Sequence, residues 1–427
     1  MSTDAREIRP LERPPNATVE VPGSKSITNR AVLLAALAEG RSELSGALFS
    51  DDTRYMVAAL RALGVAVEAD EAAARLTIEG CGGRWPVQDA DLFVGNAGTA
   101  MRFLVAALCL GHGRYRIDGT ARMRERPIGE LVDALRRLGA DVDAPGGTPP
   151  VSVRGGLSGG RTDLSAAKSS QFVSAVLQVA PYAERDVTIE LVGDVIAQPY
   201  IDMTHAMMSQ WGVRVAAESA RKFHVVAGQR YRAQRYTIEP DASSAHYFWA
   251  AAALTGGHVG VRGIADGSLQ GDVRFVHLLH DLGMADYCQD GDALSVSGWS
   301  FQLEGGFDAD MNAFSDTVPT LAVLAAFATK PVRIFNVRHL RWQESDRLHA
   351  IVTELQKLGG NVEELEDGMV IHPSTLHGGT VQTYDDHRIA MAFALVGLKV
   401  PGIRIENPGC VAKTFPDFFE KLECLRQ

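Results

Sequence analysis

The chain has 427 residues, of which 46% are hydrophobic and 22% are charged, a composition typical of a folded globular protein. Its 42 lysines and arginines are outnumbered by 52 aspartates and glutamates, and the formal net charge of −10 argues against a broad nucleic-acid-binding surface. At this length we expect two or three domains rather than one hydrophobic core.

The five cysteines form no CxxC pair and no zinc-ligand spacing. The N-terminal residues are charged and carry prolines without an apolar signal-peptide core. The longest apolar runs fall well short of the roughly twenty residues that a membrane-spanning helix needs. We therefore expect a cytoplasmic protein with reduced cysteines and without metal, membrane or nucleic-acid partners.

The first distinctive stretch is VPGSKSITNR, residues 21–30, which precedes the apolar run AVLLAALA. We expect Ser26 or Thr28 to cap a helix that is buried on all sides. Lys25 and Arg30 would then lie at its positive end, where buried cations are costly unless an anion pairs with them. The alternative is a capped core helix whose two basic side chains extend to solvent.

The same pattern of a polar cluster followed by an apolar helix recurs at intervals of roughly seventy residues. The apolar helices are expected to begin near Asn29, Ala100, Ser170, Ser244, Thr317 and His387. Amphipathic helices such as LVDALRRLG alternate with them and end in similarly spaced glycines, namely Gly64, Gly139, Gly212, Gly283 and Gly359. Two patterns with one period predict a sixfold repeat of α/β units.

The repeats form two sets of three. We expect a first domain over residues 21–240 and a second domain that combines residues 1–20 with 241–427, with a hinge near 20–21 and 240–241. In each domain three buried helices would lie parallel, covered by strands and amphipathic helices. If both domains turn the N-termini of these helices toward a shared cleft, the cleft would attract a multiply charged anion.

Basic residues stand close to the expected helix starts. Gathered in one cleft, they would form a binding set for phosphate and carboxylate groups, which the planar guanidinium of arginine suits well. The set comprises Lys25, Arg30, Arg126, Arg347, Arg388 and Lys413. The ordinary alternatives are a solvated face for the RMRERPI segment and helix capping or packing elsewhere.

Three acidic residues accompany these cations. Asp316 is either a helix cap or a carboxylate directed at the cations, and Asp386 would orient Arg388. Glu344 lies one helical turn from Arg347, where a surface ion pair is the alternative. Because the sequence lacks GxxxxGK[ST], GxGxxG after a strand, HExxH and GxSxG, we do not expect an ATPase, a Rossmann dehydrogenase, a zincin or a hydrolase.

Several segments match a known family in order along nearly the whole chain. They are PGSKSITNRAVLLAALA, GNAGTAMRFL, RMRERPIGELVDALRRLGA, SSQFVSAVL, PYIDMT, PDASSAHYF, QESDRL, DDHRIAMAFAL and AKTFPDFFEKL. Through them the sequence resembles the 5-enolpyruvylshikimate-3-phosphate (EPSP) synthase family, the 3-phosphoshikimate 1-carboxyvinyltransferases. The resemblance implies the α/β enolpyruvyl transferase fold, an inside-out α/β barrel of two domains with three βαβαββ units each, which close on substrate.

The resemblance also implies an activity: transfer of the enolpyruvyl group of phosphoenolpyruvate to the 5-hydroxyl of shikimate 3-phosphate, with release of phosphate and without cofactor or metal. Asp316 would be the base, and Glu344 with Lys25 would move protons at the methylene carbon. Phosphoenolpyruvate would be bound by Lys25, Gly98, Arg126, Gln171, Arg347, Arg388 and Lys413. Shikimate 3-phosphate would be bound by Lys25, Ser26, Arg30, Ser169, Ser170, Gln171, Tyr200, Asp316, His339 and Gln343.

Four positions depart from the family pattern. Gln343 replaces a common lysine, Ala197 a phosphate-binding serine, His339 an asparagine and Phe103 a proline. The first two remove donors to the phosphorylated acceptor. We expect a monomer, and we expect glyphosate to compete with phosphoenolpyruvate because Gly98 leaves room for it.

Two other functions stay open at this point. One is enolpyruvyl transfer to UDP-N-acetylglucosamine, although the RMRERPI region lacks the cysteine and Ser26 replaces the asparagine typical of those enzymes. The other is a non-catalytic anion-binding relative. The presence of Asp316 and Glu344 argues against that second alternative.

Overall fold

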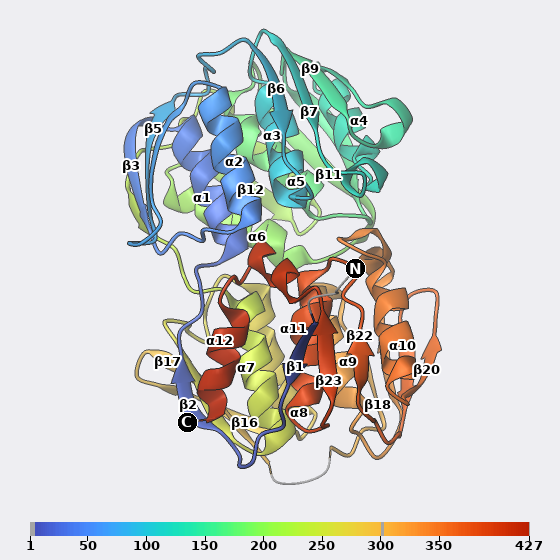
Figure 1. The fold of residues 1–427 in the computed structure, drawn as a ribbon. Helices are drawn as coiled ribbons and strands as arrows, with labels where there is room; N and C mark the ends of the chain where they lie inside the picture. Colours follow the sequence, from blue (N-terminus) through green and yellow to red (C-terminus); the bar gives the residue numbers. More distant parts are fainter. Residues whose placement is uncertain (1–4, 300–302, 427) are drawn as a thin grey trace. The chain divides into compact units, whose positions relative to one another are not determined.

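The structure, a computed structural model, describes residues 5–299 and 303–426. The chain divides into two compact units (Figure 1). Unit 1 consists of Met1–Pro22 and Glu239–Gln427, and unit 2 of Gly23–Ile238. None of the described helices is both long and apolar enough to cross a membrane.

Unit 2 repeats one arrangement of elements three times. Its helices are α1 (Lys25–Leu37), α2 (Asp51–Ala62), α3 (Gly98–Leu108), α4 (Gly129–Arg137), α5 (Gln171–Val179) and α6 (Gln198–Gln210). Its strands are β3 (Glu39–Ser45), β4 (Ala66–Asp70), β5 (Arg75–Cys81), β6 (Asp89–Phe93), β7 (Arg114–Asp118), β8 (Asp141–Asp143), β9 (Val151–Gly155), β10 (Gly160–Ala166), β11 (Val187–Val195), β12 (Val215–Ser219), β13 (Lys222–Val225) and β14 (Arg235–Thr237).

Unit 1 follows the same plan. Its helices are α7 (Ala242–Thr255), α8 (Arg274–Asp281), α9 (Val318–Ala325), α10 (Arg347–Lys357), α11 (His387–Gly397) and α12 (Phe418–Glu423). Its strands are β1 (Ala5–Ile8), β2 (Asn16–Val19), β15 (His258–Arg262), β16 (Ala285–Asp290), β17 (Ala293–Gly298), β18 (Phe307–Asp310), β19 (Val332–Phe335), β20 (Asn361–Glu364), β21 (Met369–His372), β22 (Gly379–Val381) and β23 (Ile403–Glu406).

The sheets share one topology. In unit 2 their strand orders are β14-β3-β5-β4, β6-β7-β9-β8 and β10-β11-β13-β12, and in each the first pair is parallel and the others antiparallel. In unit 1 the orders are β2-β15-β17-β16 and β18-β19-β21-β20, while the last sheet is β22-β23-β1. Among the described strands these sheets stay separate and do not close into a barrel.

In each unit, strands that are far apart in the sequence pair with one another. β2, from the N-terminal segment, pairs in parallel with β15 of unit 1, and β14 returns from the end of unit 2 to pair with β3. β1 pairs antiparallel with β23, at the position where the other sheets have the two antiparallel strands of a hairpin. The N-terminal segment is therefore an integral part of unit 1.

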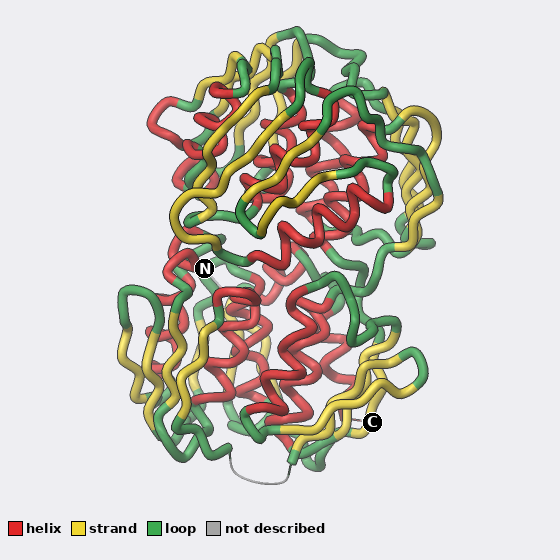
Figure 2. Tube along the Cα trace, turned by 180° about the vertical axis from the view of Figure 1, so that it is seen from behind, coloured by secondary structure: helices red, strands yellow, loops and turns green. Residues whose placement is uncertain are grey.

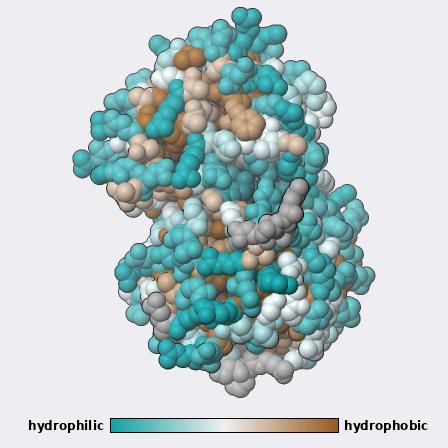
Figure 3. All heavy atoms as spheres, viewed as in Figure 1, coloured by the Kyte–Doolittle hydropathy of each residue, from teal (hydrophilic) through white to brown (hydrophobic). Residues whose placement is uncertain are grey.

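The central helices are buried on all sides, as predicted. Every residue of α3, α9 and α11 is buried. In each unit the yellow strands flank the red helices in Figure 2. On the face drawn in Figure 3, hydrophilic residues predominate and apolar residues form small patches. Apolar burial around these helices is the main source of stability for each unit.

The first helix begins earlier than expected. α1 starts at Lys25 because Ser24, rather than Ser26 or Thr28, is the N-cap, and its Oγ accepts a hydrogen bond from the Ile27 amide at 3.4 Å. Lys25 is therefore the first helical residue, and its side chain, 14% exposed, lies at the positive end of the helix.

The repeated glycines have a common backbone role. All five adopt positive φ, between 66° at Gly283 and 93° at Gly139 and Gly359. In each case the next amide bonds a carbonyl five residues back, as from Gly360 to Leu355 at 2.8 Å. This is the left-handed closure of an α-helix that glycine adopts without strain. The spacing seen in the sequence thus marks the ends of five amphipathic helices.

We predict that Gly359→Ala lowers the free energy of unfolding by about 1–2 kcal/mol, because alanine at φ +93° is strained. Its Cβ would also lie 2.9 Å from Cδ2 of His377. Gly267→Ala is the control, since no heavy atom lies within 4 Å of the added carbon and φ is not positive. Urea denaturation measures both variants, and equal stabilities would contradict the prediction.

Candidate functional site

In unit 1 the candidate residues converge on the guanidinium of Arg347, the first residue of α10. Its side chain is 1% exposed and donates to three carboxylates from different segments. Nη1 lies 3.1 Å from Asp316 Oδ1, Nη2 lies 2.7 Å from Glu344 Oε2, and Nε lies 2.8 Å from Asp386 Oδ2. Burial alone would lower the pKa of Arg347, but the carboxylates of Asp386, Glu344 and Asp316 raise it above its ordinary value.

Asp386 fixes the starts of two helices at once. It is fully buried, and besides Arg347 it accepts hydrogen bonds from Ser345 Oγ at 2.9 Å and from the Arg388 amide at 3.0 Å. The last bond caps α11. The expected orienting role of Asp386 therefore extends to Arg347 as well as Arg388.

Asp316 lies between two arginines. Its Oδ2 accepts from Arg388 Nη2 at 2.7 Å, while Oδ1 accepts from Arg347. The Asp316 side chain is 25% exposed, whereas those of Arg347 and Arg388 are 1% and 5% exposed. Asp316 is therefore a solvent-accessible carboxylate paired with two buried arginines, rather than a helix cap.

The pair of Glu344 and Arg347 is also unlike the surface ion pair that was the alternative. The Glu344 side chain is 7% exposed and lies next to the same guanidinium as Asp316. Both carboxylates are thus within hydrogen-bonding distance of one cation.

Two further candidates lie in unit 1. Gln343 directly precedes Glu344, and Lys413 ends a short 3₁₀ helix, η7 (Pro408–Lys413), that packs against α11.

His339 belongs to the same cluster through Ser315, whose Oγ lies 2.7 Å from Nε2. Burial lowers the pKa of His339 to about 4, so the ring is neutral at neutral pH and serves as a hydrogen-bonding group, as the asparagine that it replaces would. Deeper in the unit, burial raises the pKa of Asp272 to about 7, with Asp316 as the next cause. Ser243 donates a hydrogen bond to Asp272.

In unit 2 the central feature is Arg30, which is buried within the helix bundle. Its Nε donates to Thr204 Oγ1 at 2.8 Å, and Nη2 donates to Ser174 Oγ at 3.2 Å and to the Tyr200 carbonyl at 3.1 Å. Nη1 donates to the Ser26 carbonyl at 2.9 Å. Thus α1, α5 and α6 all meet at one guanidinium.

Within residues 5–299 and 303–426 no ion pair involves Arg30, and burial lowers its pKa to about 10. Its hydrogen-bond partners are neutral oxygens, unlike those of Arg347. A buried cation with neutral partners favours an approaching anion. This residue thus keeps the electrostatic character that the sequence predicts.

Arg126 lies against α3. Its Nη1 donates to the carbonyl and to Oδ1 of Asn96, both at 3.1 Å, and only 3% of the residue is exposed. A Cβ at Gly98 would lie 2.5 Å from both Arg126 Nη2 and Arg102 Nη1, so a larger residue would force these guanidinium groups to shift. Arg124, by contrast, is 55% exposed and pairs with Asp118 at 2.7 Å. Arg122 is 32% exposed and pairs with Glu125, so of the three arginines in this segment only Arg126 is buried.

The start of α5 carries the remaining polar groups of unit 2. Gln171 Nε2 donates to Thr99 Oγ1 at 3.1 Å, which links α5 to α3, and its amide donates to Ser169 Oγ at 3.2 Å. Ser170, the N-cap position, is 5% exposed. The bond to Thr99 places the Gln171 side chain at the start of α3, where Arg126 also lies against Asn96.

Two of the departures from the family pattern have clear positions. Phe103 is fully buried in α3 and lies under Arg30, with 5.3 Å between the guanidinium carbon and the ring centroid. Ala197 precedes α6 with a left-handed φ of 48°. The ring of Phe103 therefore packs against the guanidinium of Arg30.

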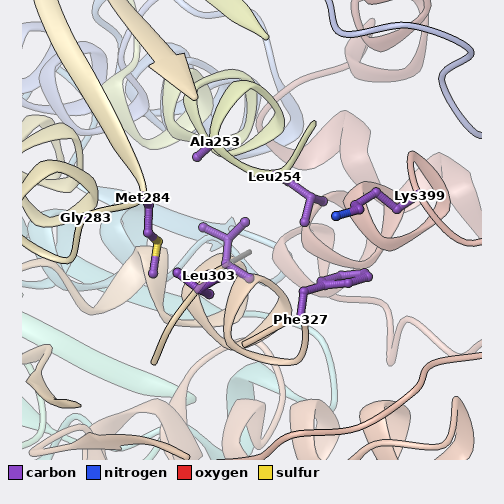
Figure 4. A pocket seen from close by; sticks show the side chains of 8 residues that line it. Ala253, Leu254, Gly283, Met284, Leu303, Phe327 and Lys399 are labelled. Atoms are coloured by element: carbon purple, nitrogen blue, oxygen red, sulfur yellow. The ribbon is translucent and has the colours of Figure 1, made fainter. Parts of the chain in front are cut away.

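A pocket elsewhere in unit 1 does not fit the expected ligands (Figure 4). Leu254, Met284, Leu303 and Phe327 line it, and Lys399 lies at its edge. It lies at the C-terminal ends of α7 and α9, whereas Asp316 and Arg347 lie at helix N-terminal ends. The described residues contain no cluster of three or more histidine, cysteine, aspartate or glutamate side chains that could hold a metal ion.

Comparison with known proteins gives a consistent result. The family model for "EPSP synthase (3-phosphoshikimate 1-carboxyvinyltransferase)" matches residues 12–422. A 3-phosphoshikimate 1-carboxyvinyltransferase of Trichormus variabilis is 48% identical over 421 residues, 98% of either chain. One of Yersinia pestis bv. Antiqua is 47% identical over 417 residues, 96% of either chain.

The fold agrees with this result. A solved EPSP synthase from Acinetobacter baumannii superposes with a TM-score of 0.80 at 28% identity. The match covers 98% of this chain and 97% of the other. The α/β fold predicted from the sequence is therefore confirmed.

We predict that His339 makes the protein less stable in acid. Because the folded-state pKa of about 4 lies below the ordinary 6.5, the unfolded state binds more protons between these values, and stability falls as pH falls through this window. His339→Asn should reduce the slope by at most about 1.4 kcal/mol per pH unit.

Urea denaturation at several pH values between about 4 and 7 measures this slope. His349→Asn is the control, since the His349 side chain is 62% exposed. Parallel stability curves for wild type and His339→Asn would contradict the prediction.

Proposed function

Because the chain belongs to the EPSP synthase family, we propose that it transfers the enolpyruvyl group of phosphoenolpyruvate to the 5-hydroxyl of shikimate 3-phosphate. The products are 5-enolpyruvylshikimate 3-phosphate and phosphate. The observation that carries the proposal is the presence of two carboxylates, Asp316 and Glu344, on one buried guanidinium, at 3.1 and 2.7 Å. Addition to and elimination from an anionic substrate require a proton acceptor, a proton donor and positive charge next to them.

In the first step Asp316 accepts the proton of the 5-hydroxyl, and the hydroxyl oxygen attacks C2 of phosphoenolpyruvate. Glu344 or Lys25 donates a proton to C3, which gives a tetrahedral intermediate. In the second step C3 loses a proton to the same group, the double bond re-forms and phosphate leaves from C2. The departing phosphate takes up the proton that Asp316 accepted, so Asp316 is restored as the base and no change of oxidation state occurs.

The cations supply binding and charge neutralisation. Arg126, Arg347, Arg388 and Lys413 would hold the phosphate and carboxylate of phosphoenolpyruvate, with the backbone at Gly98 and the amide of Gln171. The planar guanidinium groups of the arginines and the compact ammonium group of Lys413 both pair well with phosphate and carboxylate. They also stabilise the negative charge that develops in the intermediate.

The phosphorylated acceptor would be bound by Lys25, Arg30, Ser26, Ser169 and Ser170, with Tyr200 alongside. Gln171, Asp316, His339 and Gln343 would contact its hydroxyl and carboxylate groups. Arg30 supports this assignment because a buried cation with neutral partners gains most from an arriving anion. Gln343 and Ala197 offer fewer donors than the usual lysine and serine, so the remaining groups must carry more of the binding.

The proposal needs residues from both units on one pair of substrates. We propose that the chain bends near 20–21 and 240–241 to bring them there, and that the protein works as a cytoplasmic monomer. Small-angle scattering with and without both substrates would measure the bending, and an unchanged profile would contradict it.

Phosphate release tests the reaction itself. With phosphoenolpyruvate present, we expect release with shikimate 3-phosphate and none with UDP-N-acetylglucosamine or without acceptor. Release with the nucleotide sugar would assign the other enolpyruvyl transfer. No release with either acceptor, together with retained phosphoenolpyruvate binding, would indicate an anion-binding relative.

We predict that Asp316→Asn lowers turnover by about 10²–10⁴-fold, the usual contribution of a general base. The amide keeps an acceptor for only one of the two buried arginines, so the unfolding temperature should also fall, and turnover is compared well below that transition. Steady-state phosphate release measures the effect. Asp308→Asn, which removes an exposed carboxylate 3.4 Å from Arg333, is the control. Near-normal turnover in Asp316→Asn would remove this residue from the mechanism.

We predict that Gly98→Ala raises the KM for phosphoenolpyruvate and weakens inhibition by glyphosate. The added Cβ would meet Arg126 Nη2 at 2.5 Å and force that guanidinium to move. Inhibition kinetics at several phosphoenolpyruvate concentrations measure both effects. Gly129→Ala in the same unit is the control, because its nearest neighbour would be 3.4 Å away. An unchanged KM for phosphoenolpyruvate would contradict the prediction.

A further inference from the structure

The segment between β22 and α11 has an unusual backbone. Tyr384 and Asp385 are consecutive non-glycine residues with left-handed φ values of 55° and 56°. They directly precede Asp386, which bonds Arg347, and Arg388, which bonds Asp316. Because this conformation is unfavourable for side-chain-bearing residues, other contacts must hold the segment in place.

A buried carboxylate on α10 supplies such contacts. Glu354 is fully buried, and its Oε1 accepts from the hydroxyl of Tyr384 at 2.8 Å. Its Oε2 accepts from the Gln382 amide at 2.9 Å and from Lys357 Nζ at 2.6 Å. The two bonds from Gln382 and Tyr384 hold the backbone and side chain of the strained segment on the surface of α10.

Glu354 lies two turns after Arg347, so both side chains leave the same face of α10. Arg347 holds Asp386, and Glu354 holds Gln382 and Tyr384. Residues 382–386 are therefore attached to one helix at two points, one on either side of the left-handed turn. The bond between Asp386 and Arg347 belongs to the candidate site, whereas Glu354 bonds Gln382 and Tyr384 outside it.

We propose that Glu354 and Tyr384 are positioning residues for the phosphoenolpyruvate-binding arginines, an inference that rests on the proposed function. By holding the left-handed turn, they set where Asp386 stands, and Asp386 in turn fixes the Arg347 guanidinium and the start of α11 at Arg388. Burial and the bond to Glu354 raise the pKa of Tyr384 to about 12, so its hydroxyl remains a donor over the working pH range.

Tyr384→Phe tests the proposal, because it removes one hydroxyl and keeps the ring and the Glu354 carboxylate. We expect the KM for phosphoenolpyruvate to rise about three- to tenfold, the equivalent of one hydrogen bond, while the KM for shikimate 3-phosphate changes less than about twofold. Tyr115→Phe is the matched control, since it removes a hydroxyl bonded to the Val87 carbonyl in unit 2. It should leave both constants unchanged.

A purely structural role would lower the unfolding temperature of Tyr384→Phe and leave both KM values unchanged, and this result would overturn the proposal. Equal rises in both constants would also overturn it. Glu354→Gln provides a second variant: it leaves one acceptor oxygen where two are used, so it should raise the same KM at least as much as Tyr384→Phe.

The proposed function fails separately if the wild-type protein releases no phosphate from the two substrates. In that case calorimetric titration of phosphoenolpyruvate alone onto wild type and Tyr384→Phe still measures the arginines. A three- to tenfold weaker affinity in the variant would support the positioning role, and equal affinities would overturn it.

Discussion

The candidate site of unit 1 is arranged around one buried cation, Arg347. The Arg347 guanidinium is shared by Asp316, Glu344 and Asp386, which come from the starts of α9, α10 and α11. An unpaired charge at this depth would cost several kcal/mol, so the three carboxylates and the arginine require one another. The contacts that neutralise Arg347 thus also hold Asp316 and Glu344, the proposed acid–base pair, on one guanidinium.

Unit 2 also buries an arginine, Arg30, but surrounds it with neutral groups instead of carboxylates. Arg30 is as deeply placed as Arg347, yet it is surrounded by Ser174, Thr204 and backbone carbonyls, with an aromatic ring beneath. Neutral dipoles offset only part of the desolvation of a cation. One arginine is therefore neutralised by the protein, while the other leaves attraction for a ligand. In the proposed reaction both arginines bind anions, Arg30 the phosphorylated acceptor and Arg347 phosphoenolpyruvate, but only Arg347 is already paired with carboxylates of the protein.

The sequence predicted the sixfold repeat, the buried helices and the basic residues at their starts, because periodic apolar residues and closing glycines are local signals. It could not predict which members of a cluster point inward. Arg124 and Arg126 stand two positions apart, yet one pairs with Asp118 at the surface and the other lies against Gly98.

Glu354 and Tyr384 were not identified, because a buried carboxylate within an amphipathic helix resembles a solvated one until the neighbouring loop is known. The early start of α1 depended on a choice between adjacent hydroxyl residues that only the backbone geometry decides.

The pairing of β1 and β2 bears on how the chain acquires its fold during synthesis. Their partners, β23 and β15, are separated from them in sequence by hundreds of residues. While unit 2 emerges from the ribosome and can complete its own sheets, the leading segment must wait with open hydrogen-bonding edges, a state in which strands readily associate with foreign chains. The run of charges and prolines between residues 9 and 15 is well suited to that interval, because it discourages such association until the last strand arrives.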